Sequence, residues 1–450
     1  MKKNKNRFVY IVSLGCPKNF VDTEVMSAAL ITNGFGITPV PDNADVYMIN
    51  TCAFIPTARE EAEEIIREAL KWKKKQARKR KIVVAGCLNQ WDKEGIYRKM
   101  FPEVDLWPGI NDVPDMGKLF NALFRGESAS FDYATGEYLY DDVTPRIQLT
   151  LPHYAYIKIS DGCNNCCSYC TIPRIRGAFR SRTIDSVLKE AENLIKYGTK
   201  ELILIGQDLT AFGSDNNTGT LTELLTRLDQ LSGDFKIRLL YTHPAHFSDE
   251  LVKCLAGAKH ILPYIDIPLQ HISDKILTSM GRKVSRARIN ELLTAIRSSI
   301  PGVTIRTTFI TGYPGESEED YKLLKEFVKE QKFERLGVFP YYPEPDTPAA
   351  EMPDQVPPET AMERSREIME IQAEISLEHN KKLVGTEIDV IIDSFTEDDV
   401  AICRSYMDAP EIDNCIYAET SADAAPGDVI RIEITACSEY DLEGIQKGIS

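Results

Sequence analysis

The chain has 450 residues, of which 43% are hydrophobic and 27% charged, and its formal net charge is −15 at pH 7. This composition is typical of a globular protein of about two to four domains, and it excludes large-scale disorder and collagen-like structure. The negative charge argues against nucleic-acid binding over much of the surface, and no apolar run reaches the roughly 18 residues of a membrane-spanning helix. The apolar run at residues 8–14 is too short for the core of a secretory signal peptide, so we expect a cytoplasmic protein without membrane contact.

The N-terminal region, residues 1–140, alternates between strand and helix patterns. Strand patterns lie at residues 8–14, 44–50 and 81–86, and helix patterns at 21–31 and 57–80. Such alternation predicts a parallel sheet with helices on its faces, and the carboxyl ends of its strands form the ligand crevice. Cys16, Cys52 and Cys87 each follow a predicted strand by one or two residues. We therefore predict that these three cysteines form one site; the alternative is three unrelated buried thiols.

The central region, residues 141–375, repeats a strand–helix unit about six times after a poorly periodic linker at residues 126–146. Its predicted strands lie at residues 154–160, 201–206, 236–241, 261–267, 303–310 and 336–341. Helical patterns between them end at glycines such as Gly198 and Gly233, which are typical helix stop signals. Six units are too few for an eight-stranded barrel, so we predict a partial (β/α)6 barrel with its active site at the C-terminal ends of the strands.

The C-terminal region, residues 376–450, begins in a predicted helix at 359–382 and then changes to short strands divided by turns. These strand patterns lie at residues 387–393, 400–405, 415–418 and 429–435. Their spacing predicts a small antiparallel β-barrel at the end of an α/β chain. The region holds 17 Asp and Glu against 5 Lys and Arg. Such an acidic domain is a natural dock for a basic partner, and the alternative is a solvated surface.

Four of the 11 cysteines fall within eight residues, at Cys163, Cys166, Cys167 and Cys170. A disulfide framework is not expected in a cytoplasmic chain. Cys163, Cys167 and Cys170 form a C-x3-C-x2-C motif directly after the first strand of the central region. Three such ligands can hold a cubane iron–sulfur cluster and leave one iron without a protein ligand. The alternative is a structural zinc site with Cys166 as the fourth ligand, but the short loop between strand and helix favours the cluster.

A C-x3-C-x2-C motif after the first strand of a partial barrel resembles the radical S-adenosylmethionine superfamily. Tyr169 fits this resemblance, because an aromatic residue is common just before the third cysteine. The segment 205–208, which contains Gly206 and Gln207, looks like the turn that approaches the methionine part of the nucleotide. Arg306 and the turn at residues 311–316 also match the pattern. The resemblance implies that Tyr169, Gly206, Gln207 and Arg306 contact the cofactor.

The match narrows to the methylthiotransferase family, which residues 7–446 resemble. The segments that carry this resemblance are Ser-Leu-Gly-Cys-Pro-Lys-Asn at 13–19, Asp-Thr-Glu at 22–24, Asn-Thr-Cys-Ala-Phe-Ile at 50–55 and Ala-Gly-Cys at 85–87. The C-terminal barrel resembles the TRAM domain that this family carries. Pro17-Lys18 and the segment 408–413 are similar to the branch that modifies an aspartate of a ribosomal protein; the tRNA-modifying branch typically has Gln-Met at the first of these places. Cys166 and the segment 342–346 depart from the family pattern.

The resemblance implies two [4Fe-4S] clusters and S-adenosylmethionine as cofactors. Cys163, Cys167 and Cys170 would bind the cluster that cleaves the cofactor, and the N-terminal three cysteines the cluster that carries the sulfur. The implied reaction adds a methylthio group to the β-carbon of an aspartate in small-subunit ribosomal protein twelve. The implied partners are that basic protein or the ribosomal small subunit, and an electron donor protein. The alternatives are methylthiolation of tRNA adenosine and an iron–sulfur redox sensor; the acidic TRAM-like region speaks against the first, and the partial barrel against the second.

Overall fold

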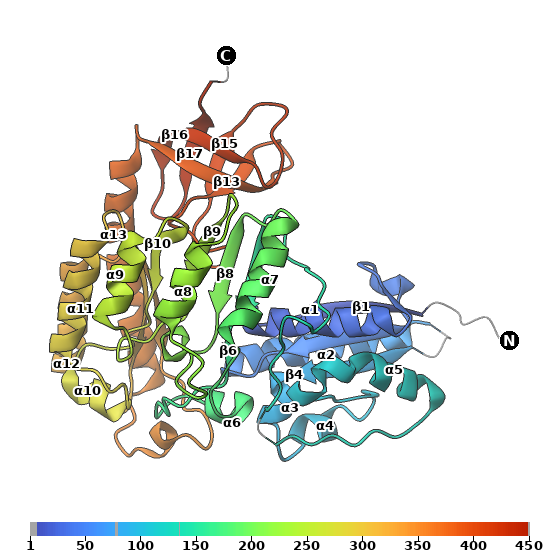
Figure 1. Ribbon diagram of the computed structural model, residues 1–450. Coiled ribbons are helices and arrows are strands. Elements are labelled where there is room, and N and C mark those ends of the chain that lie inside the picture. The colour runs from blue at the N-terminus through green and yellow to red at the C-terminus, as the bar shows by residue number, and fades with distance from the viewer. Residues whose placement is uncertain (1–6, 77–79, 135, 449–450) are drawn as a thin grey trace.

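Three sheet-based units make up the structure, which is a computed structural model that describes residues 7–76, 80–134 and 136–448 (Figure 1). An N-terminal sheet with its helices lies beside a larger curved sheet, and a small barrel lies at one end of that larger sheet. This arrangement confirms the predicted α/β fold with three parts. The boundaries at residues 140 and 375 stay predictions. None of the helices in the described residues is long and apolar enough to cross a bilayer.

The N-terminal sheet is wholly parallel, as predicted. Its strands are β1 (Arg7–Ser13), β2 (Phe35–Ile37), β3 (Val46–Thr51) and β4 (Lys81–Gly86), in the order β2-β1-β3-β4. Its helices are α1 (Pro17–Thr32), α2 (Pro56–Lys74), α3 (Cys87–Trp91), α4 (Ile96–Met100) and α5 (Met116–Arg125), with 3-10 turns η1 (Pro41–Asn43) and η2 (Ile110–Asp115). The short edge strand β2 was not predicted. The helix predicted at 57–80 ends at Lys74, and residues 77–79 of that prediction lie outside the described residues.

The central unit is the predicted partial barrel of six parallel strands. These are β5 (Tyr154–Lys158), β8 (Glu201–Ile205), β9 (Lys236–Leu239), β10 (Ile261–Asp266), β11 (Thr304–Thr311) and β12 (Arg335–Pro340), and they pair in chain order. Its longer helices are α7 (Ile184–Lys196), α8 (Leu221–Asp229), α9 (Asp249–Gly257), α11 (Arg286–Ser299), α12 (Glu318–Gln331) and α13 (Pro358–Leu383). Shorter elements are β6 (Ser160–Asp161), α6 (Ile172–Arg176), β7 (Arg180–Ser181), η3 (Leu209–Ala211), α10 (Asp274–Ser279) and η4 (Pro348–Glu351).

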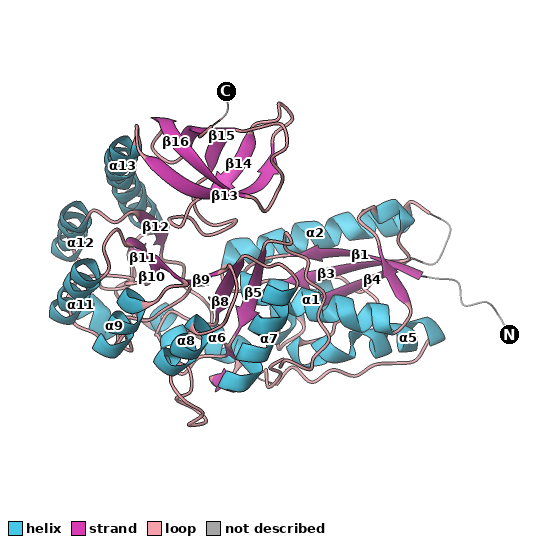
Figure 2. Cartoon of the chain, turned by 45° about the horizontal axis from the view of Figure 1, so that its top comes forward, coloured by secondary structure: helices cyan, strands magenta, loops and turns pink. Residues whose placement is uncertain are grey.

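The outer helices of the central unit cover one face of its curved sheet, as Figure 2 shows. Apolar side chains of α7, α8, α9, α11 and α12 form one buried core with those of the strands. Each of these helices begins at a Ser or Thr whose side chain accepts a hydrogen bond from the first turn, and the five N-caps are Thr183, Thr220, Ser248, Ser285 and Ser317. These caps satisfy backbone donors that would otherwise have no partner, so they fix where each helix begins.

The C-terminal unit is a closed five-stranded barrel. Its strands are β13 (Glu387–Phe395), β14 (Ala401–Arg404), β15 (Ile416–Glu419), β16 (Val429–Cys437) and β17 (Leu442–Gln446). All four predicted strands are present, and β17 was not predicted. Four pairings are antiparallel, whereas β15 and β17 pair in parallel, so the barrel is not antiparallel throughout.

The loop between β14 and β15 closes the N-terminal end of the central barrel. Arg335 on β12 binds Asp408 of this loop at 2.6 Å, and Arg306 on β11 binds Asp413 at 3.2 Å. Tyr264 on β10 donates a hydrogen bond to the same Asp413 at 2.6 Å. All three partners of the loop lie on barrel strands and face the barrel interior, so the small barrel is anchored at the end opposite α6, which Figure 1 shows at the other end of the strands.

Candidate functional site

The six cysteines of the two predicted sites line one cavity of about 410 Å³. These are Cys16, Cys52 and Cys87 from the N-terminal unit and Cys163, Cys167 and Cys170 from the central unit. Helix α1 packs between the N-terminal sheet and β5, as both overall views show. The carboxyl ends of both parallel sheets therefore face the same space, which is where open and barrel α/β folds place their ligands.

The N-terminal three cysteines converge because the loops after β1 and β3 approach each other closely. Gly15 has a φ of +85°, and a Cβ at this position would lie 2.5 Å from the Cβ of Cys52. Only glycine therefore lets Cys16 come so near to Cys52. Asn19 ties the same loops together, since its side chain donates to the carbonyl oxygen of Leu14 at 2.8 Å and its own carbonyl accepts from Asn50 at 2.8 Å.

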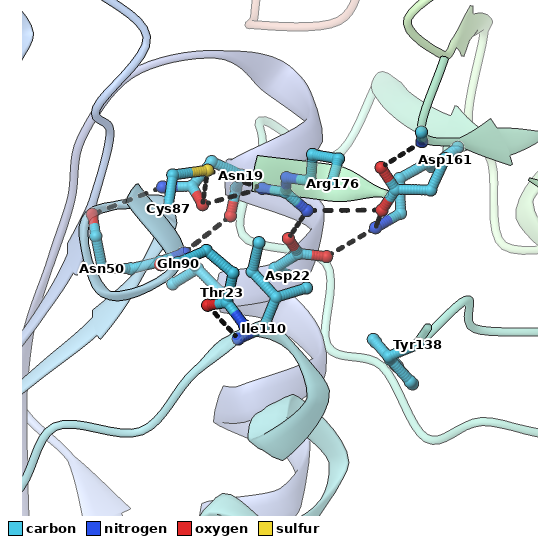
Figure 3. A network of polar contacts seen from close by, with 12 residues as sticks. Asn19, Asp22, Thr23, Asn50, Cys87, Gln90, Ile110, Tyr138, Asp161 and Arg176 are labelled. Carbon is cyan, nitrogen blue, oxygen red and sulfur yellow. Dashed lines mark hydrogen bonds and ion pairs between the residues drawn. The ribbon is translucent and has the colours of Figure 1, made fainter. Parts of the chain in front are cut away.

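A buried arginine lies against the sulfur of Cys87 (Figure 3). The Nη2 of Arg176 is 3.1 Å from this sulfur, and its Nη1 is 2.6 Å from Oδ2 of Asp22. Lys158 binds both Asp22, at 2.6 Å, and Asp161, at 3.0 Å, so that cations and carboxylates alternate in the network. Burial by itself would raise the pKa of Asp161, but Lys158 and Arg176 hold it well below the usual range. The network keeps a positive charge beside the cysteine although it is wholly buried.

The central three cysteines lie on the loop between β6 and α6, and the extra thiol is set apart from them. Cys167 is buried and lines the cavity with Cys163 and Cys170. Cys166 is exposed, has a φ of +53° and is not among the residues that line the cavity. Arg282 lies beside the central three cysteines as Arg176 lies beside the N-terminal three. Its Nη1 is 3.7 Å from the sulfur of Cys167. One buried arginine thus accompanies each set of three cysteines.

Burial makes the free thiols of the cavity weak acids. It raises the pKa of Cys163 to about 11 and the pKa of Cys170 to about 12. It also raises the pKa of Cys87 to about 12, although the adjacent Arg176 opposes the shift. Metal binding requires thiolates, so occupation of either site releases protons from these cysteines.

Two of the four predicted cofactor contacts line the cavity. They are Tyr169 and Gln207. Gly206 lies just behind this wall, where a Cβ would come within 2.4 Å of Oγ of Ser160, so glycine allows the turn after β8 to approach β6. The structure does not bring Arg306 to the cavity: its Nη1 binds Asp266 at 2.9 Å. Residues 308 and 310 of the same strand do line it, and Arg306 lies one alternation deeper toward the closed end of the barrel.

Lys18 and Tyr241 also line the cavity, and sequence reasoning did not single them out as a site. The Nζ of Lys18 lies 3.2 Å from the centre of the Tyr241 ring, and the lysine side chain is only 7% exposed. Burial lowers the pKa of Lys18, while the nearby Cys16 and Asp266 oppose this shift. Tyr241 lies two residues after the end of β9 and has a φ of +67°, which is an unusual conformation for a bulky residue.

His243 lines the cavity as a neutral imidazole. Its Nδ1 accepts a hydrogen bond from the backbone N–H of Ala245 at 3.2 Å, and burial lowers its pKa to about 3. Potential ligand atoms of Asp208, His243 and His246 lie within 4.8 Å of one another. The two imidazole rings are stacked, however, and Nδ1 of His246 already binds Asp208 at 2.8 Å. This group is therefore a hydrogen-bonded cluster beside the cysteine loop rather than a set of converging metal ligands.

Exposed apolar side chains form the rim of the cavity. Phe54 is 39% exposed, Phe339 is 52% exposed and Tyr342 is 38% exposed, and all three line the cavity. Phe54 comes from the N-terminal unit, Phe339 from β12, and Tyr342 from the loop after it. An apolar rim around an entrance is typical of a surface that contacts another molecule.

Comparison with known proteins gives the same three-part organisation. Residues 8–109 match the model of the uncharacterized protein family UPF0004, residues 157–328 match the radical SAM superfamily, and residues 384–446 match the TRAM domain. The chain is 44% identical to the ribosomal protein uS12 methylthiotransferase RimO of Geotalea uraniireducens over 97% of both chains. It is 42% identical to the protein of the same name from Trichlorobacter lovleyi, over 96% of this chain and 97% of the relative.

Among solved structures, the chain resembles the radical S-adenosylmethionine methyltransferase TsrM from Kitasatospora setae with bound cobalamin and a [4Fe-4S] cluster. The TM-score is 0.55 at 15% sequence identity, and the match covers 77% of each chain, which supports the fold. The partial barrel with its cysteine motif, joined to a second domain that brings three more cysteines to the cavity, defines a radical S-adenosylmethionine enzyme. The chain belongs to the family of ribosomal protein uS12 methylthiotransferases named RimO.

Proposed function

We propose that the protein adds a methylthio group to the β-carbon of an aspartate in ribosomal protein uS12, with two [4Fe-4S] clusters and S-adenosylmethionine as cofactors. The observation that carries this proposal is that two separate sets of three cysteines line one cavity. The names of the relatives, which match nearly the whole chain, supply the substrate.

The chemistry of the two sites fits cubane clusters. Each site offers three thiols, which leaves one iron of a cluster open for a further ligand. A zinc site would take a fourth ligand, but Cys166, the thiol available for this, is exposed and lies outside the cavity wall. We assign one cluster to Cys163, Cys167 and Cys170, and the second cluster to the N-terminal cysteines.

When bound, these groups would supply the abstraction of a hydrogen atom from a C–H bond that is not acidic, and a sulfur that takes the place of this hydrogen. The residues of the chain bind and orient the clusters, the cofactor and the substrate. Arg176 and Arg282 each place a positive charge beside a cysteine sulfur, which offsets the negative charge of thiolate ligands. Tyr169 and Gln207 lie on the cavity wall, and we infer that they contact the cofactor. The apolar rim residues exclude water around a substrate that enters between the two units.

The proposal implies two protein partners. One is uS12, whose reactive side chain has to reach a cavity below an apolar rim, so the modified aspartate lies on a protruding segment. The other is an electron donor, because the reaction begins with the transfer of one electron. We infer that the reaction takes place in the cytoplasm, where ribosomes are assembled and used.

Mass spectrometry of uS12 and of tRNA from a deletion strain tests the proposed substrate. We expect uS12 to lose the methylthio group, tRNA to keep its own, and a plasmid copy of the gene to restore the modification. A gene copy that carries Cys167→Ala should fail to restore it. Loss of a methylthio group from tRNA with unchanged uS12 would show that the substrate is wrong.

A further inference from the structure

Lys18 lies where the two units meet across the cavity. It is the second residue of α1, two positions after Cys16, and its side chain crosses to the ring of Tyr241 at the end of β9. No acidic residue lies in the first turn of α1, and no side chain caps its N-terminus. The lysine and the positive end of the helix dipole therefore add to each other beside the N-terminal cysteines.

Lys18 differs from the two cavity arginines near the cysteines, because its ammonium makes no hydrogen bond or ion pair among the described residues. Arg176 binds Asp22 and Asp161. Arg282 donates to the carbonyl oxygen of Pro268 and to the sulfur of Cys167. In the described part of the chain, no carboxylate lies within 4.0 Å of the Lys18 ammonium, which packs over the Tyr241 ring.

The acids around the cavity are already paired. Glu344, which lines it, binds Arg59 at 2.9 Å, and Asp266 binds Arg306 at 2.9 Å. A buried lysine without a paired anion is costly, and a ligand carboxylate that pairs with it offsets this cost. The cavity thus has a place for one more carboxylate, beside Lys18.

We propose that Lys18 binds the carboxylate of the substrate aspartate and that Tyr241 holds the ammonium in position for it. This inference rests on the proposed function, because it takes an aspartyl side chain as the group that enters. In aspartate the β-carbon is bonded directly to the carboxyl carbon, so a fixed carboxylate also fixes the carbon that reacts. The position of Lys18, next to Cys16 and facing the barrel, then places that carbon between the two sets of cysteines.

A binding experiment without turnover tests this role. The probes are two fluorescent peptides of the modified uS12 segment, one with the native aspartate and one with asparagine at that position, titrated into the holoenzyme without reductant. The wild-type enzyme should bind the aspartate peptide about tenfold more tightly or better, because the peptide with asparagine loses the charge that pairs with the lysine. Equal affinity of the wild-type enzyme for the two peptides would overturn the inference, whatever any variant does.

Two substitutions of Lys18 then test whether this residue causes the preference for the aspartate peptide. Lys18→Met should weaken binding of the aspartate peptide to the level of the asparagine peptide and leave the latter unchanged, while Lys18→Arg should retain much of the preference. Lys118→Met, at a lysine that is 76% exposed on α5, serves as the matched control and should change neither affinity. Iron and sulfide content checks that each variant keeps its clusters.

A second measurement separates the substrate from the cofactor, which also carries a carboxylate. If Lys18 held the carboxylate of the cofactor instead, Lys18→Met would weaken the binding of both peptides equally. It would also reduce S-adenosylmethionine binding, which equilibrium dialysis without peptide measures. This result would overturn the inference. Failure of the proposed function looks different, because the wild-type enzyme would then bind neither peptide and modify neither.

Discussion

Arg59 on α2 and Glu344, in the loop after β12, form a buried ion pair of two hydrogen bonds between the N-terminal and central units. The distances are 2.9 Å from Nη1 to Oε2 and 3.1 Å from Nη2 to Oε1. The same Nη1 donates to the carbonyl oxygen of Ala53, the neighbour of Cys52, at 3.0 Å. The pair therefore joins a cysteine loop of one unit to the cavity wall of the other. It also gives a role to the segment 342–346, in which this chain departs from the family pattern.

Arg59→Met should destabilise the contact between the two units. The substitution leaves Glu344 buried without its cation, which costs about 3–5 kcal/mol of the free energy of unfolding. We expect lower urea stability and a larger loss of methylthiolation than of cofactor cleavage, since only the first needs both units. Arg67→Met removes the exposed pair with Glu63 on the same helix and should change stability by less than about 1 kcal/mol. Equal effects of the two substitutions would show that the buried pair does not hold the units together.

Arg176→Met should impair the N-terminal cluster selectively. It removes the donor to the Cys87 sulfur and leaves Asp22 and Asp161 with Lys158 alone. Two clusters imply about eight irons per chain after anaerobic reconstitution, and the variant should lose up to about four of them while it still cleaves S-adenosylmethionine. Arg174→Met on the same helix, whose partner Asp346 is exposed, should keep the full iron content. Full iron content and full methylthiolation in the Arg176 variant would contradict the role of this arginine.

Cys166→Ser should keep the central cluster and most of the activity, whereas Cys167→Ser should lose both. Cys167 is buried and lines the cavity with Cys163 and Cys170, while Cys166 is exposed in a left-handed backbone conformation. Iron content, the absorbance of the cluster and release of 5′-deoxyadenosine check the two variants. The reverse result would mean that Cys166 is the ligand.

The stability of the protein should fall between pH 6.5 and 5.5, in part because of His271. This imidazole is fully buried, and burial lowers its pKa from 6.5 to about 3, with a further contribution from the nearby Arg364. The folded state thus binds the proton more weakly than the unfolded state, so stability is complete above about pH 6.5 and is lost by about 1.4 kcal/mol for each pH unit below it. His271→Asn should flatten the pH dependence of the urea midpoint in this range. His379→Asn, a control at a half-buried histidine on α13, should leave the slope unchanged.

Much of the fold follows from local patterns that the sequence displays. The strand predicted at 81–86 coincides with β4, and the one predicted at 8–14 differs from β1 by one residue at each end. β4 is buried on both faces, so its apolar run is continuous and easy to recognise, and β1 carries a similar run although most of its residues are half-buried. The strand β17 escaped prediction because it is short and carries Gly444 at its centre, which packs against the backbone of β16.

The candidate site was predictable only in part, because side-chain depth and pairing are tertiary properties. Cysteines at strand ends could be grouped from sequence, since parallel strands end at one edge. Arg306 lies on the expected strand, but nothing local shows that a loop from the small barrel brings Asp413 to it. Lys18 likewise stood out only as part of a motif, because the lack of an acidic partner is visible only in three dimensions.

Some of the acidic residues of the C-terminal region form ion pairs within the protein. Asp393 binds Arg404, Asp408 binds Arg335, and these carboxylates belong to buried or half-buried pairs. A count of charges therefore overstates how much negative surface this region offers to a basic partner.

The loop at residues 405–413 has a kinetic consequence. It closes the N-terminal end of the central barrel through Asp408 and Asp413, so the cavity is reached from the opposite end, past the apolar rim. We expect cofactor and ribosomal protein to share this entrance, so that a bound protein obstructs the passage of small molecules. We expect an obligatory order in steady-state kinetics, with S-adenosylmethionine binding first, its fragments leaving last, and excess uS12 slowing turnover by trapping them inside.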